Sequence, residues 1–207
     1  MKQRFRAHTI YPTILSVPPT ERQLKGRQKV VCLSRLARQA LGISAGKSKI
    51  LLPRLIKEEN GGPRPFDGYY WSLAHKSDFV GAVIAPGPVG IDIERIRPIK
   101  RSLFEKIAGE SEWGLSAADP LHQFFRYWTA KEAVLKAAAV GLKGLSLCRI
   151  KSILDDRRLV VEYLDQEWPV EQFFFEKHMA AVVRVAEHIK WILTDRFDPP
   201  VSFDSEQ

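Results

Sequence analysis

The alternation of apolar and polar residues predicts that both strands and helices build this chain. The runs at 69–75 (YYWSLAH), 79–85 (FVGAVIA) and 89–94 (VGIDIE) are typical of strands. The turn formers APGP at 85–88 should fold the second run back onto the third. Further strands are expected in RLVVEYL, EQFFFEK, HMAAVVRVA and IKWILTD, all in the last third of the chain.

Two segments predict helices. Thr20 opens a capping-box pattern ahead of apolar residues at helical spacing, and Gly42 suits the end of that helix. In the second segment, Asp119 suits the N-cap, Pro120 the first helical residue and Gly141 the termination. The chain is therefore expected to contain both strands and helices.

The size of the chain allows one domain or two small domains packed closely together, since 45% of its 207 residues are hydrophobic. His75 shortly precedes the apolar run at 79–85, and His178 immediately precedes MAAVVRVA. This echo hints at two related halves, although a chance match between apolar strands explains it equally well.

The formal charge of +8 and a pI near 9.6 predict an anionic partner: nucleic acid, a membrane surface, a phosphorylated ligand or an acidic protein. The chain has no dense basic run and no zinc-finger or RNP-like motif, which disfavours sequence-specific nucleic-acid binding. No apolar run suits a signal peptide or a membrane span. The lack of such runs leads us to expect a soluble protein. Cys32 and Cys148 have no metal-ligand spacing and suggest no disulfide framework, which suits the reducing cytoplasm.

Two carboxylates interrupt the apolar strand predicted at 89–94. Because side chains alternate along a strand, Asp92 and Glu94 should share one face while Ile91 and Ile93 point to the core. Two interpretations are open at this point. In the first, the acids are solvated or paired with Arg95 or Arg97. In the second, they are ligands of a hard divalent cation such as Mg²⁺, which prefers oxygen.

Glu132, Lys136 and His75 could also serve such a site. Trp128, Glu132 and Lys136 recur every four residues, so they form one strip along the second helix. Taken alone, Glu132 and Lys136 are more typical of an ordinary ion pair on a helix surface. His75 lies at the end of the strand that leads into the hairpin, where its imidazole could come close to the carboxylates.

Together, SLAHKSDFVGAVIAPGPVGIDIE and YWTAKEAVLKAAAVGL resemble the 4'-phosphopantetheinyl transferases of the Sfp-like, single-chain type. The resemblance covers residues 64–145. It implies an Mg²⁺-dependent enzyme, with Mn²⁺ as an alternative metal. This enzyme would transfer phosphopantetheine from coenzyme A to a serine of an apo acyl, peptidyl or aryl carrier protein, releasing adenosine 3',5'-bisphosphate.

The resemblance also implies roles for individual residues. Asp92, Glu94 and Glu132 would hold the metal ion, and Glu132 would also take the serine proton directly or through water. Lys136 would hold the coenzyme A phosphates, and Lys131 is a further candidate for the same role. His75 would contact the phosphate region of coenzyme A.

This chain departs from the family pattern in two places. Ala74 and Lys76 flank His75, where the family often has serines. The usual Gly-Lys-Pro segment is represented by GGPRP, which makes Arg64 the nearest counterpart of the lysine. Candidates for binding the 3'-phosphate are three basic residues of the first helical segment, Arg27, Lys29 and Arg38.

The resemblance implies an α/β (α+β) fold, a pseudodimer of two similar subdomains, residues 1–98 and 99–207, with the active site in the cleft between them. Each would be a small antiparallel sheet packed with helices. Such a chain is expected to act as a monomer, without nucleic-acid or membrane partners. The alternative functions are a non-catalytic module that binds coenzyme A or a carrier protein, and a basic nucleic-acid-binding protein, whose affinity would depend strongly on salt.

Overall fold

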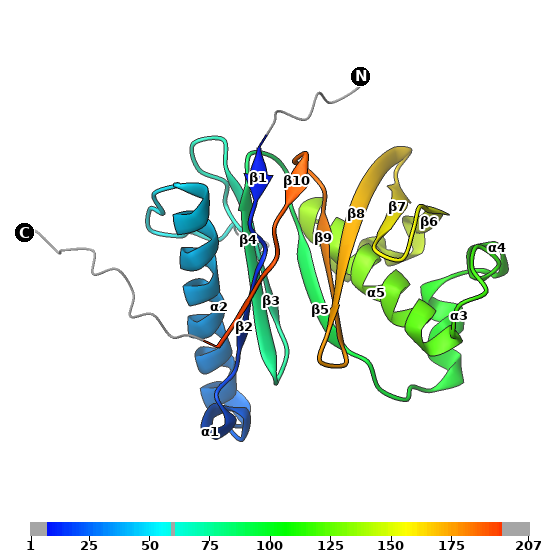
Figure 1. The fold of residues 1–207 in the computed structure, drawn as a ribbon, viewed down its shortest axis with the longest axis horizontal. Coiled ribbons are helices and arrows are strands. Elements are labelled where there is room, and N and C mark those ends of the chain that lie inside the picture. The colour runs from blue at the N-terminus through cyan, green and yellow to red at the C-terminus, as the bar shows by residue number, and fades with distance from the viewer. Residues whose placement is uncertain (1–7, 59–60, 196–207) are drawn as a thin grey trace, which may run out of the picture.

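The computed structural model describes residues 8–58 and 61–195 and shows a mixed α/β protein built on two main sheets (Figure 1). The first sheet has the strand order β11-β2-β4-β3, in which β11 runs parallel to β2 and the other neighbours are antiparallel. Its strands are β2 (Thr13–Ser16), β3 (Tyr70–His75), β4 (Phe79–Ala85) and β11 (Ile192–Thr194).

The second sheet is antiparallel throughout, with the order β5-β9-β8-β7-β6. A separate parallel pair joins β1 (Thr9–Ile10) to β10 (His188–Ile189). The strands of the second sheet are β5 (Ile91–Arg95), β6 (Cys148–Ile153), β7 (Arg158–Tyr163), β8 (Gln166–Phe175) and β9 (His178–Val183).

One long helix covers the outer face of each sheet (Figure 1). Helix α2 (Gly26–Ser48) packs on the first sheet and α5 (Pro120–Ala137) on the second. The remaining helical segments are short: α1 (Pro19–Arg22), η1 (Arg101–Leu103), α3 (Phe104–Ile107), α4 (Glu110–Trp113) and η2 (Gly141–Leu147).

Three apolar clusters connect these layers. One lies between α2 and the first sheet, one between the two sheets, and one between the second sheet and α5. In the middle cluster, Phe79 of β4 packs edge-on against Phe175 of β8 and the buried ring of His178. Burial of apolar surface therefore holds the two sheets together as well as each helix on its sheet.

Strand β5 does not pair as the sequence suggested. The turn formers at 85–88 predicted a hairpin between residues 79–85 and the GIDIE strand, but β4 lies between β2 and β3. Strand β5 pairs instead with β9, with Asp92 opposite Ala181. Strands β3 and β5 still meet, because the Ile91 amide donates a hydrogen bond to Ser72 Oγ at 3.2 Å. The long-range pairing thus prevails over the local turn signal.

The division into two subdomains at residue 98 stays a prediction. In the structure, strands from each side of residue 98 pair with strands from the other side. Strand β5 precedes residue 98 and belongs to the sheet formed mainly by later residues. Strand β11 lies far beyond residue 98 and pairs with β2. Neither sheet is therefore completed by residues from one side of the boundary alone.

Helix boundaries differ from the predicted ones in the N-terminal part. The capping-box pattern at Thr20 predicted the start of the long helix, but α1 stops at Arg22 and α2 begins separately at Gly26. The predicted stop at Gly42 is also wrong, since α2 continues to Ser48. In contrast, Asp119 caps α5 as predicted, accepting a hydrogen bond from the His122 amide at 2.9 Å.

The cysteine and membrane predictions can be compared only with the described residues. Cys32 and Cys148 are both free and buried. Within residues 8–58 and 61–195, no helix is long and apolar enough to cross a bilayer.

Candidate functional site

A close contact between Gly90 and α5 sets the geometry of the site. A Cβ atom at Gly90 would lie 1.8 Å from the Ala133 carbonyl oxygen, so only glycine fits where β5 begins. Helix α5 runs antiparallel to β5 here, with Lys136 near Asp92 and Trp128 near Glu94. The polar face of β5 therefore faces the strip of α5 at positions 128, 132 and 136, as strand alternation and helical spacing predicted.

Asp92 is the most deeply buried acid of the site, with 2% of its surface exposed. Its Oδ1 accepts a hydrogen bond from Lys136 Nζ at 2.7 Å, and the same ammonium group donates to the Ile91 carbonyl at 3.0 Å. Asp92 Oδ2 is also buried and has no hydrogen-bond partner among the described residues. One oxygen of a buried carboxylate thus remains without a donor, which is costly unless a cation or substrate group supplies one.

Glu94 lies two residues after Asp92 on β5, and its side chain is mostly buried. Its Oε1 accepts a hydrogen bond from Trp128 Nε1 at 2.8 Å and lies 2.6 Å from Lys76 Nζ. The arginine partner considered from the sequence is not used, because Arg95 lies 3.5 Å from Asp78 instead. Glu94 is therefore bound from the first half of the chain by Lys76 and from α5 by Trp128.

Glu132 lies between these two contacts, one helical turn from each, and its Oε2 is 3.9 Å from Lys136 Nζ. Burial and the negative charges of Asp92 and Glu94 raise the pKa of Glu132 to about 7, although Lys136 and Lys76 oppose the rise. A carboxylate with a pKa near neutrality can accept a proton at physiological pH, as a general base must. Physical chemistry thus favours Glu132 over the other acids for this role.

His75 ends β3 and lies among basic side chains. Desolvation of its ring, together with the positive charges of Lys136, Lys57 and Arg38, lowers the pKa of His75 to about 4. Because His75 is exposed, solvent screens part of the repulsion from these cations. The pKa still lies below its ordinary value, so the imidazole is neutral at pH 7. A neutral histidine surrounded by cations indicates a region that favours anions.

The donor atoms of the site suit a hard divalent cation. Asp92, Glu94 and Glu132 offer only oxygen ligands, which Mg²⁺ prefers, and Asp92 Oδ2 lacks a donor. In the part of the chain that the structure describes, however, no group of three His, Cys, Asp or Glu side chains is spaced as a ready metal site. Ammonium groups of Lys76 and Lys136 contact the acids of β5. The chemistry of the residues fits a metal ion, provided that these lysines give way.

Lys131, although adjacent to Glu132 in sequence, is not brought to the acids. Its side chain is buried on another side of α5, where Nζ lies 2.7 Å from Glu112 Oε1 and donates to the Ile107 carbonyl at 2.5 Å. Glu112 also accepts a hydrogen bond from the Ile150 amide at 2.8 Å. These contacts tie α5 to α4 and β6, which is a structural task.

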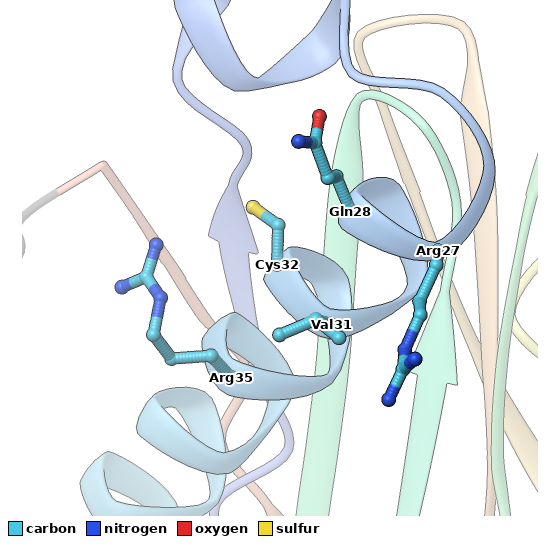
Figure 2. Close-up of a pocket in the computed structure, with 5 residues that line it drawn as sticks. All are labelled: Arg27, Gln28, Val31, Cys32 and Arg35. Atoms are coloured by element: carbon cyan, nitrogen blue, oxygen red, sulfur yellow. The ribbon is translucent and has the colours of Figure 1, made fainter.

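The other basic candidates are dispersed. Arg64 forms an exposed ion pair with Glu58 at 2.9 Å. Lys29 donates to Ser77 Oγ at 2.8 Å, in the turn after β3. Arg27 lines a shallow surface pocket at the start of α2, together with Cys32 and Arg35. Figure 2 shows the Arg27 side chain directed away from these two residues. Of the basic residues proposed for the 3'-phosphate, only Arg38 is among the cations that act on His75.

Sequence reasoning missed two basic residues, Lys76 and Lys57. Lys57 lies in the loop before β3, and its charge lowers the pKa of His75. Lys76 directly follows His75, and although burial acts to lower its pKa, the hydrogen bond to Glu94 raises it. The only signal for Lys76 was its position next to the histidine, and no spacing rule connected it to Glu94.

Comparison with known proteins identifies a family. Residues 88–187, which include α5 and all strands of the second sheet, match the family model described as 4'-phosphopantetheinyl transferase superfamily. The 4'-phosphopantetheinyl transferase psf-1 of Bacillus pumilus is 31% identical over 151 residues, which cover 66% of this chain and 64% of the relative. The 4'-phosphopantetheinyl transferase gsp of Aneurinibacillus migulanus is 36% identical over 90 residues, covering 42% of this chain and 38% of the relative.

A third relative is the 4'-phosphopantetheinyl transferase HetI of Nostoc sp., 33% identical over 112 residues that cover 51% of this chain and 47% of the relative. The chain thus spans less than two thirds of the length of each of these relatives. The family match contains Asp92, Glu94, Glu132 and Lys136, the residues that the structure brings together around β5 and α5. By this match, residues 88–187 belong to the 4'-phosphopantetheinyl transferase superfamily.

Proposed function

We propose that this chain transfers the 4'-phosphopantetheine group of coenzyme A to a serine hydroxyl of an apo carrier protein. The observation that carries the proposal is the meeting of three carboxylates and a lysine between β5 and α5: Asp92, Glu94, Glu132 and Lys136. The names of the relatives support the same activity. The basic composition suits an acidic carrier protein, since charge complementarity speeds encounter.

In the proposed reaction, the serine oxygen forms a bond to the phosphorus that carries the pantetheine group. The bond from that phosphorus to the bridging oxygen of the diphosphate breaks, and adenosine 3',5'-bisphosphate leaves with the electron pair. Glu132 accepts the serine proton, directly or through water. A pKa near 7 suits this task, because much of the Glu132 population is ionised at neutral pH.

Positive charge is needed where the leaving adenosine 3',5'-bisphosphate becomes more negative. Lys136 lies between Asp92 and Glu132, so its ammonium group can turn toward a phosphate bound beside the acids. His75, Arg38 and Lys57 form the basic region next to it, which we assign to the phosphates of coenzyme A. Lys131 has no part in this proposal, because it is buried against Glu112.

We infer that a divalent cation, Mg²⁺ or Mn²⁺, binds Asp92, Glu94 and Glu132. When bound, it would neutralise the diphosphate and the carboxylates together. The buried, unpartnered Oδ2 of Asp92 supports this assignment, as does the raised pKa of Glu132, which is caused by burial and by the negative charges of Asp92 and Glu94, since a cation would compensate for both.

We further propose that the two sheet-and-helix layers are related halves, as in a single-chain, monomeric transferase, and that substrates bind where the halves meet. Each main sheet carries one long helix, α2 or α5. Site residues come from both sides of the meeting point of β3 and β5: His75 and Lys76 from one, and Asp92 and Glu94 from the other.

The test is to incubate the protein with Mg²⁺, coenzyme A and a panel of apo carrier proteins, and then to measure the intact mass of each carrier. We expect at least one carrier to gain the mass of a phosphopantetheine group. Glu132→Gln should lower the rate by at least about 10²-fold, the usual loss for a general base. Glu187→Gln, at an exposed acid, should leave the rate unchanged. Binding of coenzyme A with no carrier modified would instead indicate a non-catalytic module.

A further inference from the structure

Lys76 occupies a defined position at the meeting point of the two sheets. It follows His75 directly, and its amide donates a hydrogen bond to the Phe79 carbonyl at 2.8 Å, which fixes the backbone of the turn. From there its ammonium group reaches Glu94 Oε1 on β5, at 2.6 Å. This is a contact between the first sheet and the acids of the second.

The contact involves an oxygen that is already hydrogen-bonded. Glu94 Oε1 also accepts from Trp128 Nε1 at 2.8 Å, so the carboxylate is held from two directions. The Glu94 side chain is 13% exposed, whereas that of Lys76 is 35% exposed. Lys76 can therefore swing into solvent more easily than Glu94 can leave its place on β5.

The electrostatic balance around Glu94 makes Lys76 a competitor of any other cation. Three carboxylates and two ammonium groups share this small region: Asp92, Glu94, Glu132, Lys76 and Lys136. A divalent cation that approached Glu94 would meet the ammonium charge of Lys76 at hydrogen-bonding distance from the same oxygen. Like charges at such separations repel, and the less buried partner should yield.

We propose that Lys76 is a built-in counter-ion that holds Glu94 in position before a divalent cation binds and competes with that cation for the carboxylate. Lys76 is thus a positioning residue, which limits the affinity for metal ions in exchange for an ordered Glu94. The proposal rests on the proposed function, since it takes Glu94 as a metal ligand.

The proposal predicts opposite effects on metal affinity and on metal-free stability. In Lys76→Ser, Mn²⁺ should bind the metal-free protein roughly two- to fivefold more tightly, the range expected for breaking a partly exposed ion pair. The unfolding temperature measured with chelator should fall, and added Mn²⁺ should raise it by more than in the original protein. Lys76→Arg, which keeps the charge, should restore both values.

The experiment titrates each protein with Mn²⁺ alone and follows free Mn²⁺ by electron paramagnetic resonance, with thermal unfolding measured in parallel. Lys100→Ser is the matched control, because it removes the same charge from an exposed position after β5. Lys76→Met serves as a second variant if the serine variant is poorly folded by circular dichroism. Equal or weaker Mn²⁺ binding in folded Lys76→Ser or Lys76→Met than in Lys100→Ser would overturn the proposal, as would no Mn²⁺ binding in any protein.

Carrier modification by the original protein separates this outcome from failure of the proposed function. If carriers gain mass but Mn²⁺ affinity ignores Lys76, only the counter-ion role is wrong. If no carrier gains mass, the transferase proposal fails, whatever the titration shows.

Discussion

Lys136 and Asp92 join the last turn of α5 to the middle of β5, with 2.7 Å between Nζ and Oδ1. Because Asp92 is buried and its other oxygen has no partner within the described residues, this lysine is its main source of positive charge. Lys136→Met should therefore lower the free energy of unfolding by roughly 1–3 kcal/mol, the cost of leaving a buried polar group unsatisfied. Urea denaturation measures this loss.

A double-mutant cycle isolates the pair. Asp92→Asn combined with Lys136→Met should cost less than the sum of the two single changes, because each single variant leaves one unpaired charge and the double variant leaves none. Additive losses would show that the ion pair does not couple the two elements.

The close approach at Gly90 makes a second prediction. Gly90→Ala would place a methyl group 1.8 Å from the Ala133 carbonyl oxygen, so α5 must move away from β5. We expect a loss of about 1–3 kcal/mol of stability or more, the usual range for overpacking, together with loss of transferase activity.

Gly42→Ala is the matched comparison for Gly90→Ala. Gly42 lies in the interior of α2, where a Cβ would meet no atom within 4 Å. Alanine should therefore stabilise the protein by up to about 1 kcal/mol, through helix propensity. Similar melting temperatures for the two alanine variants would contradict the steric explanation.

The raised pKa of Glu132 predicts an unusual pH dependence of stability. A carboxyl whose pKa rises from 4.5 in the unfolded chain to about 7 in the folded chain opposes folding increasingly as pH increases through this window. Glu132→Gln should thus be more stable than the original protein by roughly 1–3 kcal/mol at pH 8, and equally stable near pH 4. Denaturation with chelator at both pH values tests this, and a difference independent of pH would refute it.

The basic surroundings of His75 predict a low titration midpoint. The imidazole signal in nuclear magnetic resonance should titrate well below the ordinary value of 6.5, since desolvation and three nearby cations disfavour the charged ring. Arg38→Ala or Lys57→Ala should raise the midpoint, and Lys100→Ala should leave it unchanged. A midpoint at or above 6.5 would show that solvent screens these charges completely.

Much of the local structure could be predicted from the sequence. Strands β3 and β4 follow from short apolar runs, and the cap of α5 follows from Asp119 and Pro120. The shared orientation of Asp92 and Glu94 follows from strand alternation and is confirmed by their contacts with α5. Recognition of the family, which rested on the order of these motifs, is also confirmed.

Tertiary features escaped prediction for physical reasons. Strand β5 pairs with β9, some 85 residues away, and no local signal encodes such a partner. Helix α2 passes through Gly42 because the residues around it, such as Leu41 and Ala45, are buried against the sheet and outweigh the low helix propensity of glycine. The contact between Lys76 and Glu94 exists only because the two sheets meet, so it could not be read from spacing.

The return of β11 to the first sheet bears on how the protein forms during synthesis. Strand β2 is among the earliest described segments to leave the ribosome, yet its parallel neighbour β11 follows only after every strand of the second sheet. Until then, one edge of β2 exposes unpaired backbone groups that other chains could bind. The first sheet is therefore begun early and finished late, and its nascent form is the stage at which a chaperone would be of most use.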